Sequence, residues 1–572
     1  MAVESDYRPP VEDHVFLLRE AFGTDIVARA TNGELTADDA AEILEAAGDF
    51  AASVLAPLDS VGDTVGARLD EGQVRMPEGF ADAYRAFVES GWITAEAPVS
   101  AGGDGLPGAV RAGLGEFWNA SNAAFALCWL LTAGQIHALD AAASDEIREK
   151  YLSRLVSGEW TGTMNLTEPD AGSDLGAIRT MATPRDDGSW GIRGQKIFIT
   201  WGDHDIAENI VHLVLARTPD APAGAKGLSL FVVPKYLVDD AGTPGERNAV
   251  TTVAIEHKLG IHASPTCVLA YEDATGYLVG EINGGLAGMF VMMNSARAGM
   301  GYQATGIADR AYQKAARYAA ERTQGAVLDR PAGAPIAEHP DVRRLLSSMS
   351  SEIFAMRALG VYSGDLLDRE DGPDHALAEF FVPILKGWTT EDAIRLTSDA
   401  IQVFGGMGYV EETGIAQHYR DIRITPIYEG TTAIQSNDLI GRKVLRNNGA
   451  TVTDLFGRIE ETIGALGDAG DDTATRIAER LERALAAARR ATEAVLTFGD
   501  SPRDAYAAGV PYLMMLGTLA GGWMHALAVA SVVSHDDEQE SDAARLASAE
   551  VYSTHHLPRV HALAETVAAG EV

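Results

Sequence analysis

The stretch Pro-Ile-Tyr-Glu-Gly-Thr-Thr-Ala-Ile-Gln at residues 426–435 decides how the fold is interpreted. It places one carboxylate, Glu429, among apolar and small residues, where desolvation disfavours the charged form and raises the pKa. A carboxylate with a raised pKa can act as a general base near neutral pH, and Gly430 lets a ligand approach the backbone. The alternative is a glutamate in the first turn of a helix that begins near Thr431, where the helix dipole favours negative charge. This stretch alone leaves both interpretations open.

Two glycine-containing blocks upstream favour the first interpretation, in which Glu429 is a general base. Residues 167–174 read Thr-Glu-Pro-Asp-Ala-Gly-Ser-Asp, and residues 402–409 read Gln-Val-Phe-Gly-Gly-Met-Gly-Tyr. In this order, the three blocks resemble the acyl-CoA dehydrogenase family, and the resemblance is strong over roughly residues 80–446. It implies that Glu429 removes the α-proton of an acyl-CoA while the N5 atom of FAD takes the β-hydride, which yields a trans-2-enoyl-CoA.

Composition narrows the classes of function. The chain has 572 residues, 46% of them hydrophobic and 22% charged, which indicates a globular protein of two to four domains. The formal net charge of −37 disfavours nucleic acid and anionic lipid as partners. Cys128 and Cys267 lie far apart and offer no disulfide framework. The first ten residues carry charges and no apolar core, so we expect no signal peptide and a cytoplasmic location.

Changes in sequence character along the chain predict a mainly α protein with a central β-domain. Residues 1–159 are expected to form an N-terminal helical domain, and residues 160–283, with short β-branched runs, a barrel or sandwich. Helical periodicity returns over 284–447, where the resemblance implies a four-helix bundle. Residues 448–572 are expected to form an appended helical domain, because 447–449 carry a boundary signal.

Three helical segments are predicted in more detail. Residues 110–142 are apolar and alanine-rich, which favours a buried helical pair. Residues 389–404 carry a capping pattern at Thr389 and a glycine after the last residue, so we predict a helix with these bounds. Residues 512–533 hold no Asp, Glu, Lys or Arg and could cross a bilayer by length, but their glycines and alanines favour a buried helix.

The resemblance places one set of cofactor contacts in the middle domain. In the family, the loop that matches residues 164–174 bonds the pyrimidine end of the flavin, and an aromatic ring lies against the flavin. Phe198 holds the aromatic position, where many members carry Trp. Glu168 and Asp174 are expected to be structural, as loop caps. The implied FAD contacts are Met164, Leu166, Thr167, Gly172, Ser173, Phe198 and Thr200.

A second set lies in the helical part of the chain. The resemblance implies that Arg322 reaches the flavin pyrophosphate across a dimer interface, a role that suits the planar guanidinium. Pro340 and Ala433 replace glutamines that are common in the family, at two flavin contacts. The implied FAD contacts here are Arg322, Gln402, Gly405, Gly406 and Thr431, and the implied substrate contacts are Ser173, Asn294, Arg297 and Gly430.

The resemblance also implies the partners. These are an acyl-CoA substrate, an electron-transferring flavoprotein as electron acceptor, and further copies of the chain in a homodimer or dimer of dimers, with no nucleic acid and no membrane insertion. No metal is expected, because the pairs His204–Asp205 and His555–His556 have no further ligands at metal-binding spacing.

Both ends of the chain resemble the large branch of the family, which has an extra N-terminal segment and an appended C-terminal domain. Residues 6–13 and 552–560 carry this resemblance. The branch includes 3-methylmercaptopropionyl-CoA dehydrogenases and mycobacterial-type fatty acyl-CoA dehydrogenases. Two alternatives stay open, an acyl-CoA oxidase that uses oxygen and a non-dehydrogenase relative that binds DNA, although the latter needs a basic C-terminal surface that this sequence lacks.

Overall fold

The computed structural model describes residues 7–239, 241–369, 371–535 and 541–571. These residues form two compact units. The first, the barrel unit, consists of 53–106 and 122–296, and the second, the helical unit, of the described residues within 4–52, 107–121 and 297–572. Each unit combines segments from more than one of the four predicted domains, whose boundaries stay a prediction. The first six residues of the predicted N-terminal segment lie outside the described residues.

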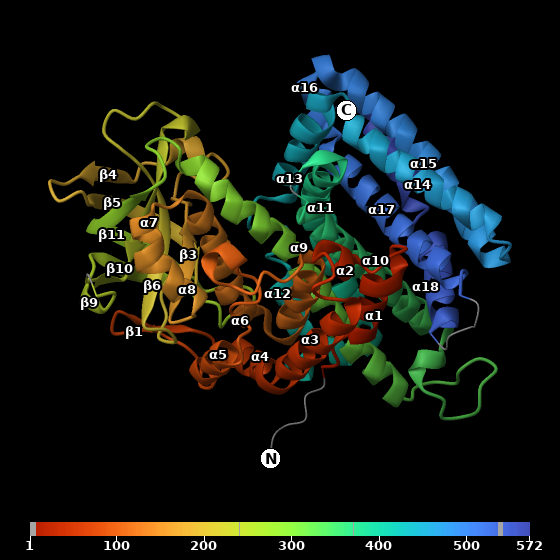
Figure 1. Cartoon of the computed structure of the whole chain (residues 1–572). Helices are drawn as coiled ribbons and strands as arrows, with labels where there is room; N and C mark the ends of the chain where they lie inside the picture. The colour runs from red at the N-terminus through yellow and green to blue at the C-terminus, as the bar shows by residue number, and fades with distance from the viewer. Residues whose placement is uncertain (1–6, 240, 370, 536–540, 572) are drawn as a thin grey trace. The chain divides into compact units, whose positions relative to one another are not determined.

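The strands of the barrel unit lie together (Figure 1), and their pairing closes them into a ring. The sheet order is β10-β11-β5-β4-β6-β3, and β7 pairs with both β11 and β6, so β11, β5, β4, β6 and β7 close on themselves. Ile192, Val214, Phe231 and Leu269 are among the side chains that fill the interior. The prediction of a barrel or sandwich is therefore confirmed, and the pairing shows that the domain is a barrel. The strands are β3 (Trp160–Asn165), β4 (Met181–Pro184), β5 (Trp190–Thr200), β6 (Asn209–Arg217), β7 (Leu228–Pro234), β10 (Val250–Ile255) and β11 (Thr266–Val279).

Short helices and two hairpins complete the barrel unit. The remaining elements are α4 (Asp59–Val65), α5 (Phe80–Glu89), α7 (Asp145–Ile147), α8 (Ser153–Val156), β1 (Arg68–Asp70) with β2 (Gln73–Arg75), and β8 (Tyr236–Val238) with β9 (Pro244–Arg247). Helix α6 (Gly108–Ala142) breaks at Asn122, whose φ of −160° and ψ of 89° are not helical. The Asn122 side chain accepts a hydrogen bond from the Phe125 N–H and so caps the second part of α6. The predicted helical pair over 110–142 is confirmed.

The helical unit contains the long helices of the predicted bundle. Helix α9 is joined to α10 by the Asp309–Arg357 ion pair and to α11 by a stack of Tyr318 on Phe404, whose ring centroids lie 4.2 Å apart. The helices up to residue 438 are α1 (Val11–Phe16), α2 (Ile26–Ala30), α3 (Ala37–Phe50), α9 (Gly285–Glu321), α10 (Pro340–Leu367), α11 (Gly372–Phe404), α12 (Ile415–Ile422) and α13 (Thr432–Asp438).

Helix α11 begins much earlier than the sequence pattern suggested. The predicted start at Thr389 is wrong, because the helix already begins at Gly372 and continues through Pro383. The Thr389 hydroxyl donates to the carbonyl of Leu385 inside the helix and does not cap an end. The predicted end is confirmed, since Gly405 follows the last helical residue with a φ of 60°.

The appended helices pack around one apolar helix. Figure 1 shows α14, α15 and α17 side by side. Helices α6 and α17 are long and apolar enough to span a membrane, but 89% and 83% of their most apolar windows are buried inside the protein. This burial agrees with the prediction of a buried helix over 512–533. The helices are α14 (Ala450–Asp468), α15 (Asp472–Thr497), α16 (Pro502–Ala507), α17 (Gly509–Val532), α18 (Asp542–His555) and α19 (Arg559–Ala569).

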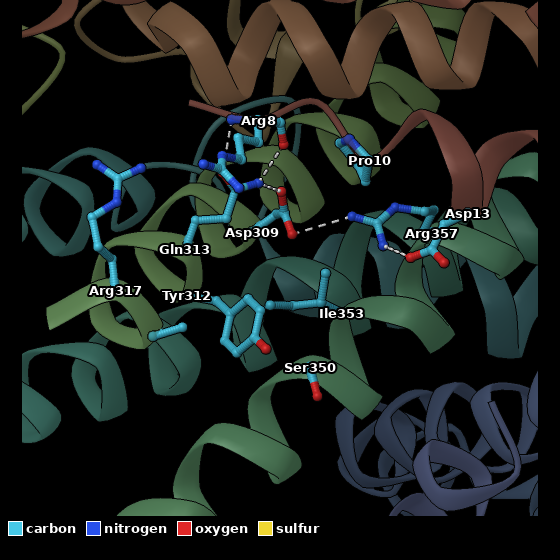
Figure 2. Close-up of a pocket in the computed structure, with 11 residues that line it drawn as sticks. Arg8, Pro10, Asp13, Asp309, Tyr312, Gln313, Arg317, Ser350, Ile353 and Arg357 are labelled. Atoms are coloured by element: carbon cyan, nitrogen blue, oxygen red, sulfur yellow. Dashed lines mark hydrogen bonds and ion pairs between the residues drawn. The ribbon is translucent and has the colours of Figure 1, made fainter. Parts of the chain in front are cut away.

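A buried arginine anchors the N-terminal segment within the helical unit. The Arg357 guanidinium donates to Glu116 at 2.6 Å and to Asp13 at 2.9 Å, and it lies 3.3 Å from Asp309. The His14 Nε2 atom lies 3.0 Å from the Glu116 carboxylate. Burial would raise the pKa of the Glu116 carboxyl, but Arg357 and His14 outweigh it and lower the pKa to about 2. Figure 2 shows Asp13 and Asp309 on either side of Arg357, beside a cavity of about 560 Å³.

This network gives a first prediction. Arg357→Met leaves Glu116 buried without its main cationic partner, which costs about 3–5 kcal/mol of the free energy of unfolding. Denaturant unfolding followed by circular dichroism measures the change. Arg344→Met is the matched control, because Arg344 pairs with the exposed Asp341. This substitution should lower the free energy of unfolding by at most about 1 kcal/mol. Equal losses in the two variants would contradict the anchoring role of Arg357.

Candidate active site

Glu429 lies on a tight turn between α12 and α13 in the helical unit. Its φ of 56° is in the left-handed region, and the next residue, Gly430, also has a positive φ, of 89°. A left-handed conformation costs a non-glycine residue roughly 1–2 kcal/mol, so the surrounding structure must hold Glu429 in place. Thr431 is the N-cap of α13, which puts Glu429 before the helix and outside its first turn. The structure therefore argues against the alternative of a simple helix-dipole glutamate.

Two buried side chains hold the carbonyl groups of this turn. Lys386 of α11 donates from Nζ to the Gly430 carbonyl at 2.6 Å. The Gln435 amide donates to the carbonyls of Glu429 and Gly430 at 3.1 and 3.2 Å. With both carbonyls held inside the protein, the backbone path of the turn is fixed by contacts from α11 and α13.

Flanking hydrogen bonds fix the residues on both sides of the turn. The Tyr428 hydroxyl donates to the buried amide oxygen of Gln303 on α9. On the other side, the Thr432 hydroxyl donates to the Glu391 carboxylate at 2.5 Å. Residues from α9, α11 and α13 therefore position one carboxylate.

The electrostatic surroundings keep Glu429 near its midpoint of ionisation at neutral pH. Burial raises the pKa of the Glu429 carboxyl, Arg297 and Lys386 oppose the rise, and the result is about 7. The predicted direction of the shift is confirmed. Arg297 itself is buried, and burial lowers its pKa while Asp438 and Glu429 oppose the change. A carboxylate with a pKa near 7, under the electrostatic influence of two cations, is suited to accept a proton from a bound ligand.

The first set of implied flavin contacts lies together in the barrel unit. Met164 is on β3, and Leu166 and Thr167 follow it. The Ile197 N–H donates to the Thr167 carbonyl at 2.9 Å, which joins this loop to β5 near Phe198 and Thr200. Gly172 and Ser173 are exposed at the tip of the same loop.

Glu168 and Asp174 support this loop, as predicted. The Glu168 carboxylate accepts hydrogen bonds from the backbone N–H groups of Arg179 and Thr180 at 2.7 and 3.0 Å, and it pairs with the buried Lys196 at 2.9 Å. Asp174 accepts from the Gly176 N–H at 2.9 Å and caps a 3₁₀ turn. Both carboxylates are engaged within the protein.

Phe198 is an aromatic side chain held out in solvent. Its ring is 58% exposed, and its φ is 57°. The register of β5 against β11 shifts at this point, and such a bulge re-aims a side chain. An exposed aromatic face beside hydroxyl and backbone polar groups fits a flavin ring, which needs a stacking surface and polar partners at its edge.

The second set of implied flavin contacts lies at one end of the helical unit. The stack of Tyr318 on Phe404 holds the ends of α9 and α11 together, which brings the segment of Arg322 near the glycine turn that begins at Gly405. Gln402, Gly405, Gly406 and Arg322 are exposed. Thr431 lies apart from them, beside Glu429, where its hydroxyl accepts from the Ile434 N–H.

Sequence reasoning missed four residues around Glu429. These are Gln303, Lys386, Glu391 and Gln435. One signal was available for Lys386, because it is a single cation inside the apolar run 380–388. Gln303 and Glu391 carry no local pattern, since each becomes significant only through a contact with a distant part of the chain. Gln435 lies within the stretch 426–435 itself and binds carbonyls five and six positions before it. Asn294, an implied substrate contact, is exposed on α9.

The chain matches four family models in order along its length. They are the acyl-CoA dehydrogenase N-terminal domain at residues 37–159, the middle domain at 163–274, the C-terminal domain at 283–445, and the acetyl-CoA dehydrogenase C-terminal-like domain at 455–572. The chain belongs to the acyl-CoA dehydrogenase family. The predicted family and its large branch, with the appended C-terminal domain, are confirmed.

Relatives in this family match almost the whole chain. The 3-methylmercaptopropionyl-CoA dehydrogenase of Ruegeria pomeroyi is 48% identical over 561 residues, which cover 96% of this chain and 95% of the relative. The broad-specificity linear acyl-CoA dehydrogenase FadE5 of Mycobacterium tuberculosis is 35% identical, with 98% and 97% covered. The structure of an acyl-CoA dehydrogenase complexed with FAD from Bacillus anthracis aligns with a TM-score of 0.75 at 23% identity, over 93% of this chain and 89% of that one, and so supports the fold.

The pKa of Glu429 gives a second prediction. Glu429 has a higher pKa in the folded protein, about 7, than its ordinary value of 4.5, so its ionisation weakens folding as the pH rises through 7. Glu429→Gln mimics the protonated form. We expect the variant to unfold at a higher temperature than the wild type at about pH 8, with the difference shrinking towards about pH 5.

Thermal unfolding followed by circular dichroism across this pH range is the measurement. Glu460→Gln is the matched control, because the Glu460 side chain is 56% exposed and should leave the melting temperature unchanged. If the wild type is more stable than Glu429→Gln at about pH 8, the ionised Glu429 carboxylate does not destabilise the fold and the prediction is wrong.

Proposed function

We propose that the protein catalyses the FAD-dependent α,β-dehydrogenation of an acyl-CoA thioester to a trans-2-enoyl-CoA, with Glu429 as the base that takes the α-proton. Membership of the acyl-CoA dehydrogenase family supports the class of reaction. The observation that carries the assignment of the base is a carboxylate with a pKa near 7 on a turn fixed from three helices. At neutral pH about half of such a group is ionised and ready to accept a proton.

The backbone of the same turn supplies a group for the thioester. Among the described residues, none accepts a hydrogen bond from the Glu429 N–H. A thioester carbonyl bound there would receive this hydrogen bond, and the α-carbon next to it would lie close to the Glu429 carboxylate. The N–H would then stabilise the negative charge that develops on the carbonyl oxygen as the α-proton leaves.

FAD, when bound, supplies the acceptor for the β-hydride. We assign its binding to the exposed Phe198 ring, the hydroxyls of Thr167 and Thr200, and the loop around Gly172. The other contacts assigned to FAD are Met164, Leu166, Ser173, Arg322, Gln402, Gly405, Gly406 and Thr431. The contacts assigned to the acyl-CoA are Ser173, Asn294, Arg297 and Gly430.

A short acyl-CoA is the substrate to test first. The relative that is 48% identical over nearly the whole chain is a 3-methylmercaptopropionyl-CoA dehydrogenase. We propose 3-methylmercaptopropionyl-CoA as the first candidate, with linear acyl-CoAs as the comparison set, because a single pocket residue changes discrimination by only about 1–3 kcal/mol. We assign electron-transferring flavoprotein as the acceptor and the cytoplasm as the location.

A second copy of the chain is the proposed partner of an exposed apolar segment. Tyr409 is 93% exposed, and Met407 and Val410 beside it are 49% and 39% exposed. Burying such a segment is favourable, and it follows directly on the glycine turn assigned to FAD. We propose a homodimer or a dimer of dimers. Sedimentation measures the state, and a monomer at micromolar concentration would rule the assembly out.

An anaerobic titration of the purified flavoprotein gives the third prediction. Acyl-CoA thioesters, including 3-methylmercaptopropionyl-CoA, should bleach the flavin absorbance of the wild type. Glu429→Gln should keep the flavin but bleach about 10²–10⁴-fold more slowly, because a general base contributes that factor. Glu379→Gln is the control, because Glu379 pairs with Lys443 away from the turn and should bleach at the wild-type rate.

The outcomes separate the alternatives. Bleaching of Glu429→Gln at the wild-type rate would remove Glu429 as the base. Rapid oxygen consumption with an acyl-CoA in air would identify an oxidase with the same base. A bound flavin that no acyl-CoA bleaches would point to a relative with another function, and failure to bind flavin after reconstitution would refute the proposal.

A further inference from the structure

Lys386 is a buried cation that donates its hydrogen bond to a neutral group, a backbone carbonyl. Its side chain is 0% exposed, on the stretch of α11 that also buries Leu385 and Trp388. Its Nζ donates to the backbone carbonyl of Gly430 at 2.6 Å. Burial of an ammonium group is costly unless opposite charge compensates it, and a carbonyl carries no net charge. The compensation must therefore come from carboxylates nearby.

Those carboxylates are Glu429 and Glu391. Both raise the pKa of Lys386, but burial has the larger, opposite effect and brings it to about 8. The Glu391 carboxylate already accepts a hydrogen bond from the Thr432 hydroxyl, so it is not dedicated to Lys386 alone. Lys386 therefore affects Glu429 in two ways. Its ammonium binds the carbonyl of Gly430, the next residue after Glu429, and its positive charge lowers the pKa of the Glu429 carboxyl.

We propose that Lys386 is the positioning residue of the catalytic base: its ammonium holds the Gly430 carbonyl so that Glu429 keeps its left-handed conformation, and its charge favours the ionised form of the Glu429 carboxylate. The inference rests on the proposed role of Glu429. Lys386 binds the turn through the Gly430 carbonyl, and in this proposal it acts through Glu429. Gln435 shares the first task but carries no charge, which leaves the second to Lys386 and Arg297.

Other charged groups surround the same turn. Arg297 of α9 works in the same direction as Lys386 and lowers the pKa of Glu429, while Asp438 of α13 raises the pKa of Arg297 and so favours its charged form. Among the described residues, the further charged groups that act on Arg297 or Lys386 include Glu391 of α11, Asp438 of α13 and Arg442 of the π-helical turn Leu439–Val444. All of them stay in place when Lys386 alone is replaced, so a single variant isolates its charge.

The fourth prediction concerns the titration of Glu429 itself, measured without turnover. Difference infrared spectroscopy of the holoenzyme follows the protonated-carboxyl band that Glu429→Gln removes. The midpoint should lie near 7 in the wild type. Lys386→Met should raise it by roughly one unit, the effect of losing one nearby opposite charge. Lys443→Met, which removes a lysine paired with Glu379, should leave it unchanged. A midpoint that does not move in Lys386→Met overturns the proposal.

Two further variants separate charge from packing. Lys386→Arg keeps the cation and should restore a midpoint close to 7. Lys386→Gln keeps a donor without the charge, should behave like Lys386→Met, and replaces it if Lys386→Met does not fold. A midpoint in Lys386→Arg as high as in the uncharged variants would assign the effect to altered packing and overturn the proposal.

Flavin reduction by acyl-CoA adds a kinetic readout. A rise of one unit in the pKa of Glu429 lowers the ionised fraction at about pH 7 about fivefold, so Lys386→Met should be reduced about fivefold more slowly there and recover towards the wild-type rate at about pH 9. A loss that is equal at all pH values overturns the charge role. If no acyl-CoA reduces the wild-type flavin, the proposed function fails, while the infrared midpoints still decide the role of Lys386.

Discussion

The hydrogen bond from the Lys386 ammonium to the Gly430 carbonyl is the contact on which the arrangement of the site depends. Glu429 and Gly430 both adopt left-handed backbone conformations, which a chain leaves unless other contacts hold it. The buried side chains of Lys386 and Gln435 donate hydrogen bonds to the carbonyls of Gly430 and Glu429, respectively. These contacts use the carbonyls of the turn and not the carboxylate or the N–H of Glu429, which are the groups that the proposed function assigns to the ligand.

The bundle supplies these contacts because its helices are long and tightly joined. Helix α11 carries both Lys386 and Glu391, and α9 carries Gln303 and Arg297. A side chain on a long helix is placed by the packing of the whole helix, so its position is more constrained than that of a loop residue. Glu429, the proposed base, is on a turn, but the side chains described above that bind this turn and its flanking residues are on helices.

The sequence predicted what local chemistry determines and missed what distant contacts determine. Glu429 among apolar neighbours, the capping Thr431 and the glycine after Phe404 are local patterns, and each was interpretable without a structure. Lys386 lies 44 positions before the carbonyl that it binds, so no local pattern connects them. The start of α11 was misplaced because Thr389 resembles a cap, whereas burial of the preceding apolar run extends the helix through Pro383.

If FAD covers the exposed ring of Phe198, as proposed, the stability of the protein depends on its cofactor supply. A ligand that covers this ring in the folded state and ignores the unfolded chain adds about 2.7 kcal/mol of stability at a free concentration one hundred times its Kd. Chains made when flavin is scarce would lack this added stability, and their exposed Phe198 ring would be accessible to chaperones and proteases. Cellular abundance of the enzyme would then follow flavin availability without any change in its synthesis.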